Sequence, residues 1–234
     1  MATFGLLHGA WHDPWCWGLL ADRLEAMGHR TIVPDLPLHD PAAGYLQRVQ
    51  PMVDALERAE DEVVVVAHSQ SSALGPLVAD SRAGARSVSA LVYLCPRMGG
   101  IDLPDETPPV FREGIPFPQA RSDETSVWDP VVAAEVMYSR LSPETAQELV
   151  RRLRPMAMPP DEYPLSEHPG IPTALIYAAG DELFEPSFER FVARDVLGIE
   201  PIELPGGHFQ MLENPDAVAR LLDRLSPAGT IPSR

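Results

Sequence analysis

The fold is decided by residues 61–73, which read DEVVVVAHSQSSA. Four consecutive valines with no polar alternation are typical of a strand that is covered on both faces of a parallel sheet. The small residues after them predict a tight turn into a helix. Ser69 falls at this turn, where its hydroxyl would stand clear of the chain and close to backbone N–H groups. Ser69 is therefore a candidate nucleophile, although the same pattern also fits a serine that only caps a helix.

Outward from this stretch, short apolar runs alternate with helical patterns along the chain. We expect six strands, at residues 3–7, 30–33, 62–67, 88–94, 172–177 and 201–204. Alternation of strands and helices predicts an α/β protein, with a mostly parallel sheet of about six strands flanked by helices.

One segment interrupts this alternation. Residues 97–170 include 12 prolines and no convincing strand. Two helices are expected there, at 130–140 and 143–154, because each follows a capping residue and begins with proline. We interpret the segment as a small, mostly helical lid inserted into a single domain with its core at 1–96 and 171–225; an independent second domain is the weaker alternative. Residues 226–234 are expected to form a frayed tail.

The composition argues against several classes of function. The net charge is −16 and no basic run is present, which argues against nucleic acid and anionic membrane partners. All 18 basic residues are arginines, so mechanisms that need a catalytic lysine are excluded. The two cysteines form no C-x-x-C pair, and neither His12-Asp13 nor His39-Asp40 has a partner at metal-ligand spacing. We therefore expect no metal and no cofactor.

The N-terminal residues show neither the charged segment nor the apolar stretch of a signal peptide. The expectation is a cytoplasmic protein that binds a small molecule. The sequence leaves open whether it forms a homodimer.

Two further residues stand where a catalytic serine would need partners. Asp181 follows the strand expected at 172–177, and His208 follows the strand expected at 201–204. Carboxyl ends of parallel strands meet at one edge of a sheet, so both side chains are expected near Ser69. His208 would accept the Ser69 proton, and Asp181 would orient the imidazole and stabilise its charged form. Taken singly, the aspartate could belong to an ordinary turn and the histidine to the surface or core.

These residues resemble the α/β-hydrolase family, whose elbow reads G-x-S-x-G and whose triad has the order Ser, acid, His. Residues 7–17 (LHGAWHDPWCW), 34–37 (PDLP) and 207–215 (GHFQMLENP) are similar to a subgroup with plant methylesterases and hydroxynitrile lyases. The elbow departs from the family pattern at Ala67 and Ser71, both of them small residues.

The resemblance also implies roles for other residues. The N–H groups of Ala10 and Gln70 would form the oxyanion hole, and His68 would be structural. Trp11 and Phe209 would contact the substrate because they adjoin these catalytic positions.

The function implied is a serine hydrolase that cleaves a small, largely apolar carboxylic ester through an acyl-enzyme on Ser69. A hydroxynitrile lyase is disfavoured, because those enzymes use a lysine where this chain has Phe209. Another cofactor-free reaction, a lyase or a secondary-metabolite tailoring step, stays open because of the unusual elbow, as does a small-ligand binder on this scaffold. Three arginines, Arg151, Arg152 and Arg154, either clamp an anionic substrate or form a solvated helix face.

Overall fold

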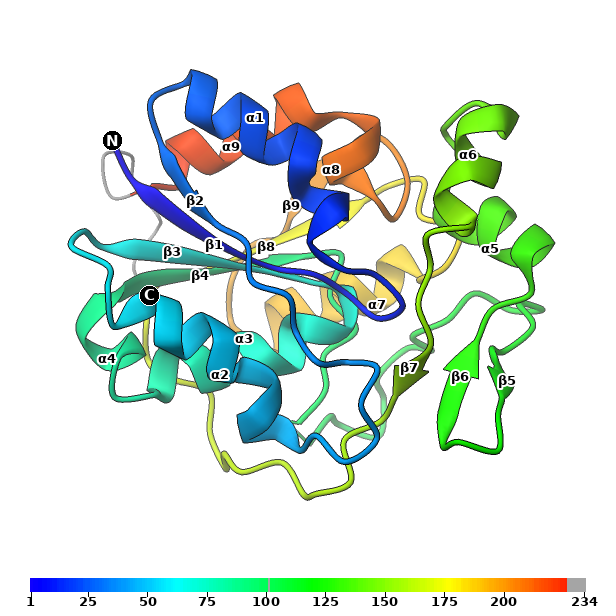
Figure 1. Ribbon diagram of the computed structural model, residues 1–234, viewed down its shortest axis with the longest axis horizontal. Helices are drawn as coiled ribbons and strands as arrows, with labels where there is room; N and C mark the ends of the chain where they lie inside the picture. Colours follow the sequence, from blue (N-terminus) through cyan, green and yellow to red (C-terminus); the bar gives the residue numbers. More distant parts are fainter. Residues whose placement is uncertain (101, 227–234) are drawn as a thin grey trace.

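The computed structural model describes residues 1–100 and 102–226. Six parallel strands form the central sheet in the order β2-β1-β3-β4-β8-β9 (Figure 1). Every strand end lies within one residue of its predicted position, which confirms the predicted α/β class. The strands are β1 (Thr3–Leu7), β2 (Arg30–Ile32), β3 (Val63–His68), β4 (Val88–Leu94), β8 (Thr173–Ala178) and β9 (Ile202–Leu204).

Strand β3 shows why the valine run specifies this sheet. It lies between β1 and β4, and all six of its residues are buried. Successive side chains point to opposite faces, so Val64 and Val66 belong to one hydrophobic cluster and Val63 and Val65 to the other. A central strand covered on both sides therefore needs apolar residues at consecutive positions.

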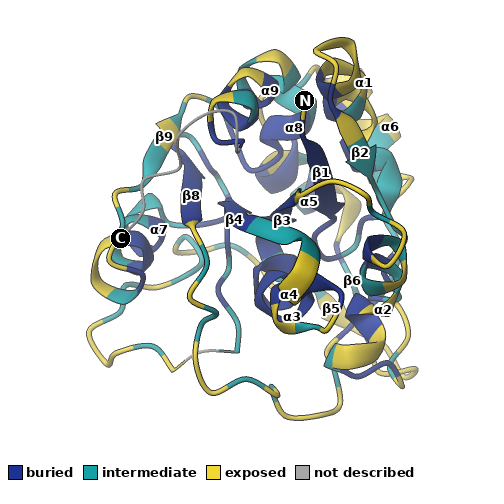
Figure 2. Ribbon diagram, turned by 90° about the vertical axis from the view of Figure 1, so that its left-hand side faces the viewer, coloured by how far each residue is buried: buried dark blue, intermediate teal, exposed yellow. Residues whose placement is uncertain are grey.

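Helices cover both faces of the sheet (Figure 1), and the strands between them are largely buried (Figure 2). None of the helices in the described part of the chain is long and apolar enough to span a bilayer. One layer contains α1 (Gly18–Ala26), α8 (Gln210–Glu213) and α9 (Pro215–Arg224); the other contains α2 (Tyr45–Leu56), α3 (Leu74–Asp80), α4 (Gly84–Ser87) and α7 (Pro186–Phe191).

Residues 97–170, here called the inserted segment, differ in part from the expectation. Both predicted helices form, as α5 (Pro130–Met137) and α6 (Pro143–Val150), but they end three to four residues early. The expectation of no strand was wrong, because β5 (Gln119–Ala120), β6 (Thr125–Val127) and β7 (Met156–Ala157) make a small antiparallel sheet. Strands of two or three residues are too short to give a periodic pattern, and β7 pairs with a distant part of the chain.

The end of the chain was expected to fray from residue 226. Ser226 is instead buried, and its hydroxyl donates a hydrogen bond to the Asp223 carbonyl at 2.7 Å. The rest of the predicted tail, residues 227–234, lies outside the described residues.

Candidate active site

The three residues expected to form a triad meet at the carboxyl edge of the sheet. The Nε2 atom of His208 lies 3.0 Å from Ser69 Oγ, and its Nδ1 lies 2.7 Å from Asp181 Oδ2. Exposed fractions are 7% for Ser69, 1% for His208 and 0% for Asp181. The sequence placed these residues at strand ends, and the fold brings them within hydrogen-bond distance of one another.

Ser69 occupies the sharp turn between β3 and the 3₁₀ helix Ser69–Ala73. Its φ of +53° lies in the left-handed region, which a residue with a side chain adopts only when its surroundings impose it. Gly9, in the loop after β1, presses against this turn. A Cβ added at Gly9 would lie 2.9 Å from His68 Nδ1 and 3.0 Å from Ser69 Cβ. The loop after β1 therefore packs so closely on the elbow that a side chain at position 9 would displace it.

The two departures from the glycine pattern are accommodated by specific contacts. The Ser71 hydroxyl donates a hydrogen bond to the His8 carbonyl, which ties the elbow to the loop after β1. Ala67 is buried where Gly75 of α3 comes close, and a Cβ on Gly75 would lie 3.2 Å from Ala67 Cβ. A methyl group at position 67 is therefore accommodated by a glycine eight residues later.

Asp181 is held by several hydrogen bonds. Its Oδ1 accepts from the backbone N–H groups of Leu183 at 2.8 Å and Phe184 at 2.9 Å, which leaves Oδ2 for His208. The Nε of Arg112 donates to the Asp181 carbonyl. Because a carboxylate can only accept, the proton of neutral His208 lies on Nδ1 and its Nε2 can accept from Ser69.

The loop that carries Ala10 is positioned by a histidine that the sequence offered only as a possible metal ligand. His12 Nδ1 donates to the Ala10 carbonyl at 2.8 Å, and His12 Nε2 accepts from the Tyr138 hydroxyl at 2.6 Å. Burial lowers the pKa of His12 to about 3, so the ring is neutral. The Ala10 N–H has no acceptor among the described residues, as an oxyanion donor requires. No local pattern could reveal this role, since Tyr138 is 126 residues away in the chain.

Trp11 and Phe209, expected to contact substrate, both have protein contacts of their own. The Trp11 indole N–H donates to the Ser126 carbonyl of β6 at 3.1 Å, and its ring meets Trp128 edge-on at 5.4 Å. Phe209 is 2% exposed and stacks on His12 at 4.2 Å. Trp11 thus joins the loop after β1 to the inserted segment, and Phe209 packs beneath that loop. Their contact with substrate stays a prediction.

His68 lies beneath the triad. Its Nε2 donates to the His208 carbonyl at 3.0 Å, and burial lowers its pKa well below the usual value. A neutral ring that holds the His208 backbone fits the structural role implied for it.

Two buried groups behind the triad were not anticipated. Glu189 on α7 is fully buried, and neither carboxylate oxygen has a hydrogen-bond partner among the described residues. Burial, reinforced by the charge of Asp181, raises the pKa of Glu189 well above the usual range. Burial likewise raises the pKa of the Cys95 thiol.

Cys95, Asp181 and His208 place three potential metal-ligand atoms within 4.8 Å of one another. However, Asp181 and His208 already bond to each other at 2.7 Å, and burial favours a protonated thiol that is a poor ligand. The arrangement fits a catalytic triad better than a metal centre.

The three arginines at residues 151–154 do not point to substrate recognition. Arg154 pairs with Asp13 at 3.1 Å and with Asp35 at 2.7 Å, and the Arg152 guanidinium lies 4.4 Å from the Trp15 ring centre. These two residues tie the inserted segment to the core, which neither alternative predicted. Arg151 is exposed and lines a cavity of about 590 Å³ between α5 and α6.

Comparison with known proteins agrees with this architecture. Residues 6–221 match the model of the alpha/beta hydrolase family. Methylesterase 7 of Arabidopsis thaliana is 25% identical over 94% of each chain. The carbendazim hydrolyzing esterase of Nocardioides sp. (strain SG-4G) is 27% identical over 96% of this chain and all of its own.

Solved structures show the same fold. A pyrethroid hydrolase superposes with a TM-score of 0.77 at 20% identity, covering 95% of this chain and 96% of its own. A methylesterase from Arabidopsis superposes with a TM-score of 0.75 at 20% identity, covering 96% and 98%. The family match spans nearly all of the chain, so the protein belongs to the alpha/beta hydrolase family.

Proposed function

We propose that the protein is a serine hydrolase that cleaves a small, largely apolar carboxylic ester through an acyl-enzyme on Ser69. The observation that carries the proposal is the hydrogen-bonded chain from Asp181 through His208 to Ser69. The relatives named as a methylesterase and a carbendazim hydrolyzing esterase support an ester as the substrate.

The geometry suits a two-step reaction. Ser69 Oγ attacks the ester carbonyl carbon while His208 Nε2 takes the hydroxyl proton, and Asp181 stabilises the resulting imidazolium. The oxyanion accepts hydrogen bonds from the N–H groups of Ala10 and Gln70. His208 returns the proton to the departing alcohol, which leaves an acyl-enzyme. Water activated by His208 then attacks the acyl carbon, and the acid leaves as Ser69 regains its proton.

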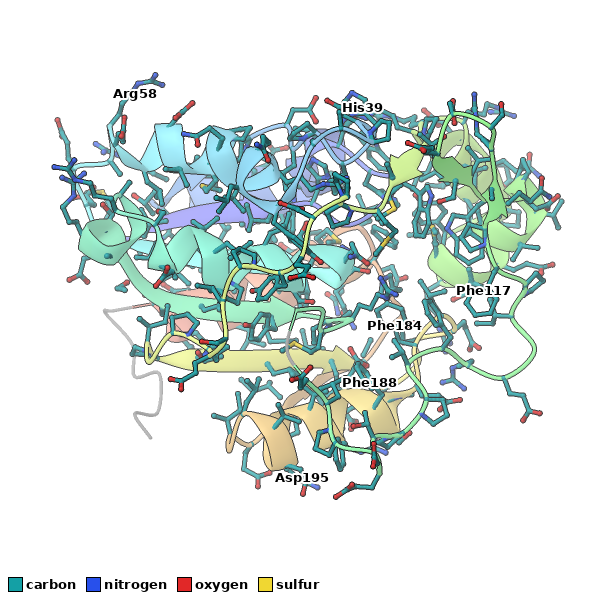
Figure 3. The ribbon with its side chains drawn as sticks, turned by 90° about the horizontal axis from the view of Figure 1, so that it is seen from below. His39, Arg58, Phe117, Phe184, Phe188 and Asp195 are labelled. Carbon is teal, nitrogen blue, oxygen red and sulfur yellow. The ribbon has the colours of Figure 1, made fainter. Side chains whose placement is uncertain are left out.

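The inserted segment acts as the lid and supplies apolar surface to the site. The Phe184 ring lies 4.6 Å from the His208 ring, and Phe111 of the inserted segment lies 5.4 Å from Phe184. Phe117 extends this row, 5.5 Å from Phe111; Figure 3 labels Phe184 and Phe117 where the inserted segment meets the end of the sheet. Edge-on aromatic rings of this kind favour hydrocarbon groups of a substrate.

Labelling with a serine-reactive fluorophosphonate, followed by intact-mass and peptide mass spectrometry, tests the proposal. We expect one adduct on Ser69, none on Ser69→Ala and much slower labelling of His208→Ala. Ser71→Ala is the matched control and should keep the adduct, because Ser71 Oγ is buried and bonded to the His8 carbonyl. A folded native protein that gains no adduct, or an adduct that persists in Ser69→Ala, would contradict the proposal.

A panel of small methyl esters then separates hydrolysis from the alternatives. Repeated release of acid and alcohol is expected of a hydrolase. Acylation that stops after one turnover would instead indicate a ligand-binding protein, and labelling without acid release would indicate a non-hydrolytic reaction.

A further inference from the structure

Arg97 is the first residue of the inserted segment and lies directly beside the elbow. Its backbone N–H donates to the Ser69 carbonyl at 3.2 Å. Its guanidinium Nη1 donates to the side-chain oxygen of Gln70, the residue after the candidate nucleophile. The guanidinium carbon lies 5.9 Å from the centre of the Phe111 ring.

These contacts connect Arg97 to the triad from two directions. Phe111 contacts Phe184, Phe184 contacts His208, and His208 bonds to Ser69. Gln70 follows Ser69 in the sequence and accepts the hydrogen bond from Arg97. The Arg97 guanidinium and the Phe111 ring are thus each linked to the triad through one intervening residue, Gln70 and Phe184 respectively.

Arg97 has no acidic partner among the described residues. Within the described ranges, no carboxylate oxygen lies within 4.0 Å of its guanidinium. A guanidinium has five N–H donors, and only the one to Gln70 has an acceptor among the described residues. Burial lowers the pKa of Arg97, yet a guanidinium stays protonated at neutral pH.

Arg97 is half-buried and has no acidic partner among the described residues, in a chain with 34 acidic and 18 basic residues. Partial burial removes some of the water around the guanidinium, and a bound anion would compensate for that loss. Because the protein has a net charge of −16, its overall field repels an anionic substrate. Such a substrate therefore needs a cation close to the site.

We propose that Arg97 binds a carboxylate of the substrate, so that the preferred substrate is a small ester with a second, ionised carboxylate. The inference rests on the proposed ester hydrolysis and refines it: the aromatic rings contact the hydrocarbon part, and the guanidinium holds the charged end. Arg97 is then a specificity-determining residue, since its planar fork matches the two oxygens of a carboxylate.

A purely structural Arg97, which only holds Gln70, makes a different prediction. Loss of that contact would slow the hydrolysis of charged and neutral esters alike. Loss of a carboxylate partner would lower the rate selectively for the charged ester. The ratio of the two rates therefore distinguishes the explanations.

The test compares monomethyl glutarate with methyl pentanoate, which has a methyl group in place of the carboxylate. Methanol release gives kcat/KM for each ester in the native protein and in Arg97→Gln. We expect the native protein to favour monomethyl glutarate, and the acid-to-neutral ratio to fall by about tenfold or more in Arg97→Gln. Arg97→Lys keeps the charge and should retain part of the preference.

Arg220→Gln is the matched control, because it changes the net charge equally on an exposed residue of α9. Its ratio should equal that of the native protein. A ratio that Arg97→Gln leaves unchanged, with both esters hydrolysed, would overturn the inference and leave the proposed function standing.

If neither ester is hydrolysed, the proposed ester hydrolysis loses support. Carboxylate binding can still be tested without turnover. Calorimetric titration with glutarate should then show binding to the native protein that is at least about tenfold weaker in Arg97→Gln. Equal binding to both proteins, or none to either, would overturn the carboxylate site.

Discussion

Hydrogen bonds fix the orientation of the Asp181 carboxylate. Two backbone N–H groups hold one carboxylate oxygen, and the other oxygen faces His208 at 2.7 Å. The carboxylate is fully buried, so its orientation cannot relax into solvent. The imidazole is consequently fixed in the tautomer that can accept a proton from Ser69.

Asp181→Asn should lower kcat by about 10⁴-fold, the effect of the equivalent change in a serine protease triad, because an amide can stabilise the wrong imidazole tautomer. Steady-state ester hydrolysis measures the loss, and urea unfolding checks that the variant folds. Asp195→Asn, at an exposed residue of the helical turn Val192–Val196 that follows α7 (Figure 3), is the control and should keep the native kcat. Retention of more than a tenth of the native kcat in Asp181→Asn would contradict the assigned role.

At the scale of elements, the site depends on how closely the loop after β1 approaches the elbow after β3. The two strands are paired in parallel, with Leu7 opposite Ala67, so their carboxyl ends carry Gly9 and Ser69 to the same place. The contact leaves no room for a Cβ at Gly9. The position of the Ala10 N–H, which we propose as an oxyanion donor, thus depends on a glycine, not on a polar side chain.

Gly9→Ala should therefore lower kcat by more than about tenfold, because displacement of an oxyanion donor costs up to 10²–10³-fold. The rate of fluorophosphonate labelling should fall in parallel. Gly18→Ala is the matched control: a Cβ there meets no atom within 4 Å, so activity should be unchanged. Native activity in Gly9→Ala would show that the loop can move without affecting the reaction.

At the scale of the whole molecule, buried histidines lower the stability at acidic pH, and the buried Glu189 lowers it as the pH rises. Burial lowers the pKa of His8 to about 4 and that of His12 to about 3. The unfolded chain binds more protons than the native protein between these values and 6.5, so stability is lost as the pH falls through this window. Glu189 has the opposite effect, since its raised pKa keeps a proton in the native state that the unfolded chain releases above about 4.5.

Glu189→Gln tests the second effect. A glutamine needs no proton uptake on folding, so the variant should gain stability relative to the native protein as the pH rises from 5 to 8. The measurement is the free energy of unfolding in urea at both pH values. A stability difference that is the same at pH 5 and pH 8 would show that Glu189 is ionised in the native protein.

Much of the fold follows from local patterns. The six strands of the central sheet were predicted to within one residue because buried strands, turns and helix starts each have a distinctive local composition. The candidate triad could be assembled for the same reason: Ser69, Asp181 and His208 each follow a recognisable strand, and parallel strands end at one edge. The inserted segment was predicted less well, since its strands have only two or three residues and β7 pairs with a distant part of the chain.

The sequence by itself determined the α/β class, the strand positions and the three residues of the candidate triad, because backbone hydrogen bonding and burial on two faces leave periodic signals. Only the tertiary structure decided which side chains support the site. The bond from His12 to Tyr138 and the burial of Glu189 behind Asp181 depend on packing between elements far apart in the chain. That Arg97 has no carboxylate partner among the residues described by the structure is likewise visible only in three dimensions, because the sequence next to Arg97 does not determine which groups pack around it.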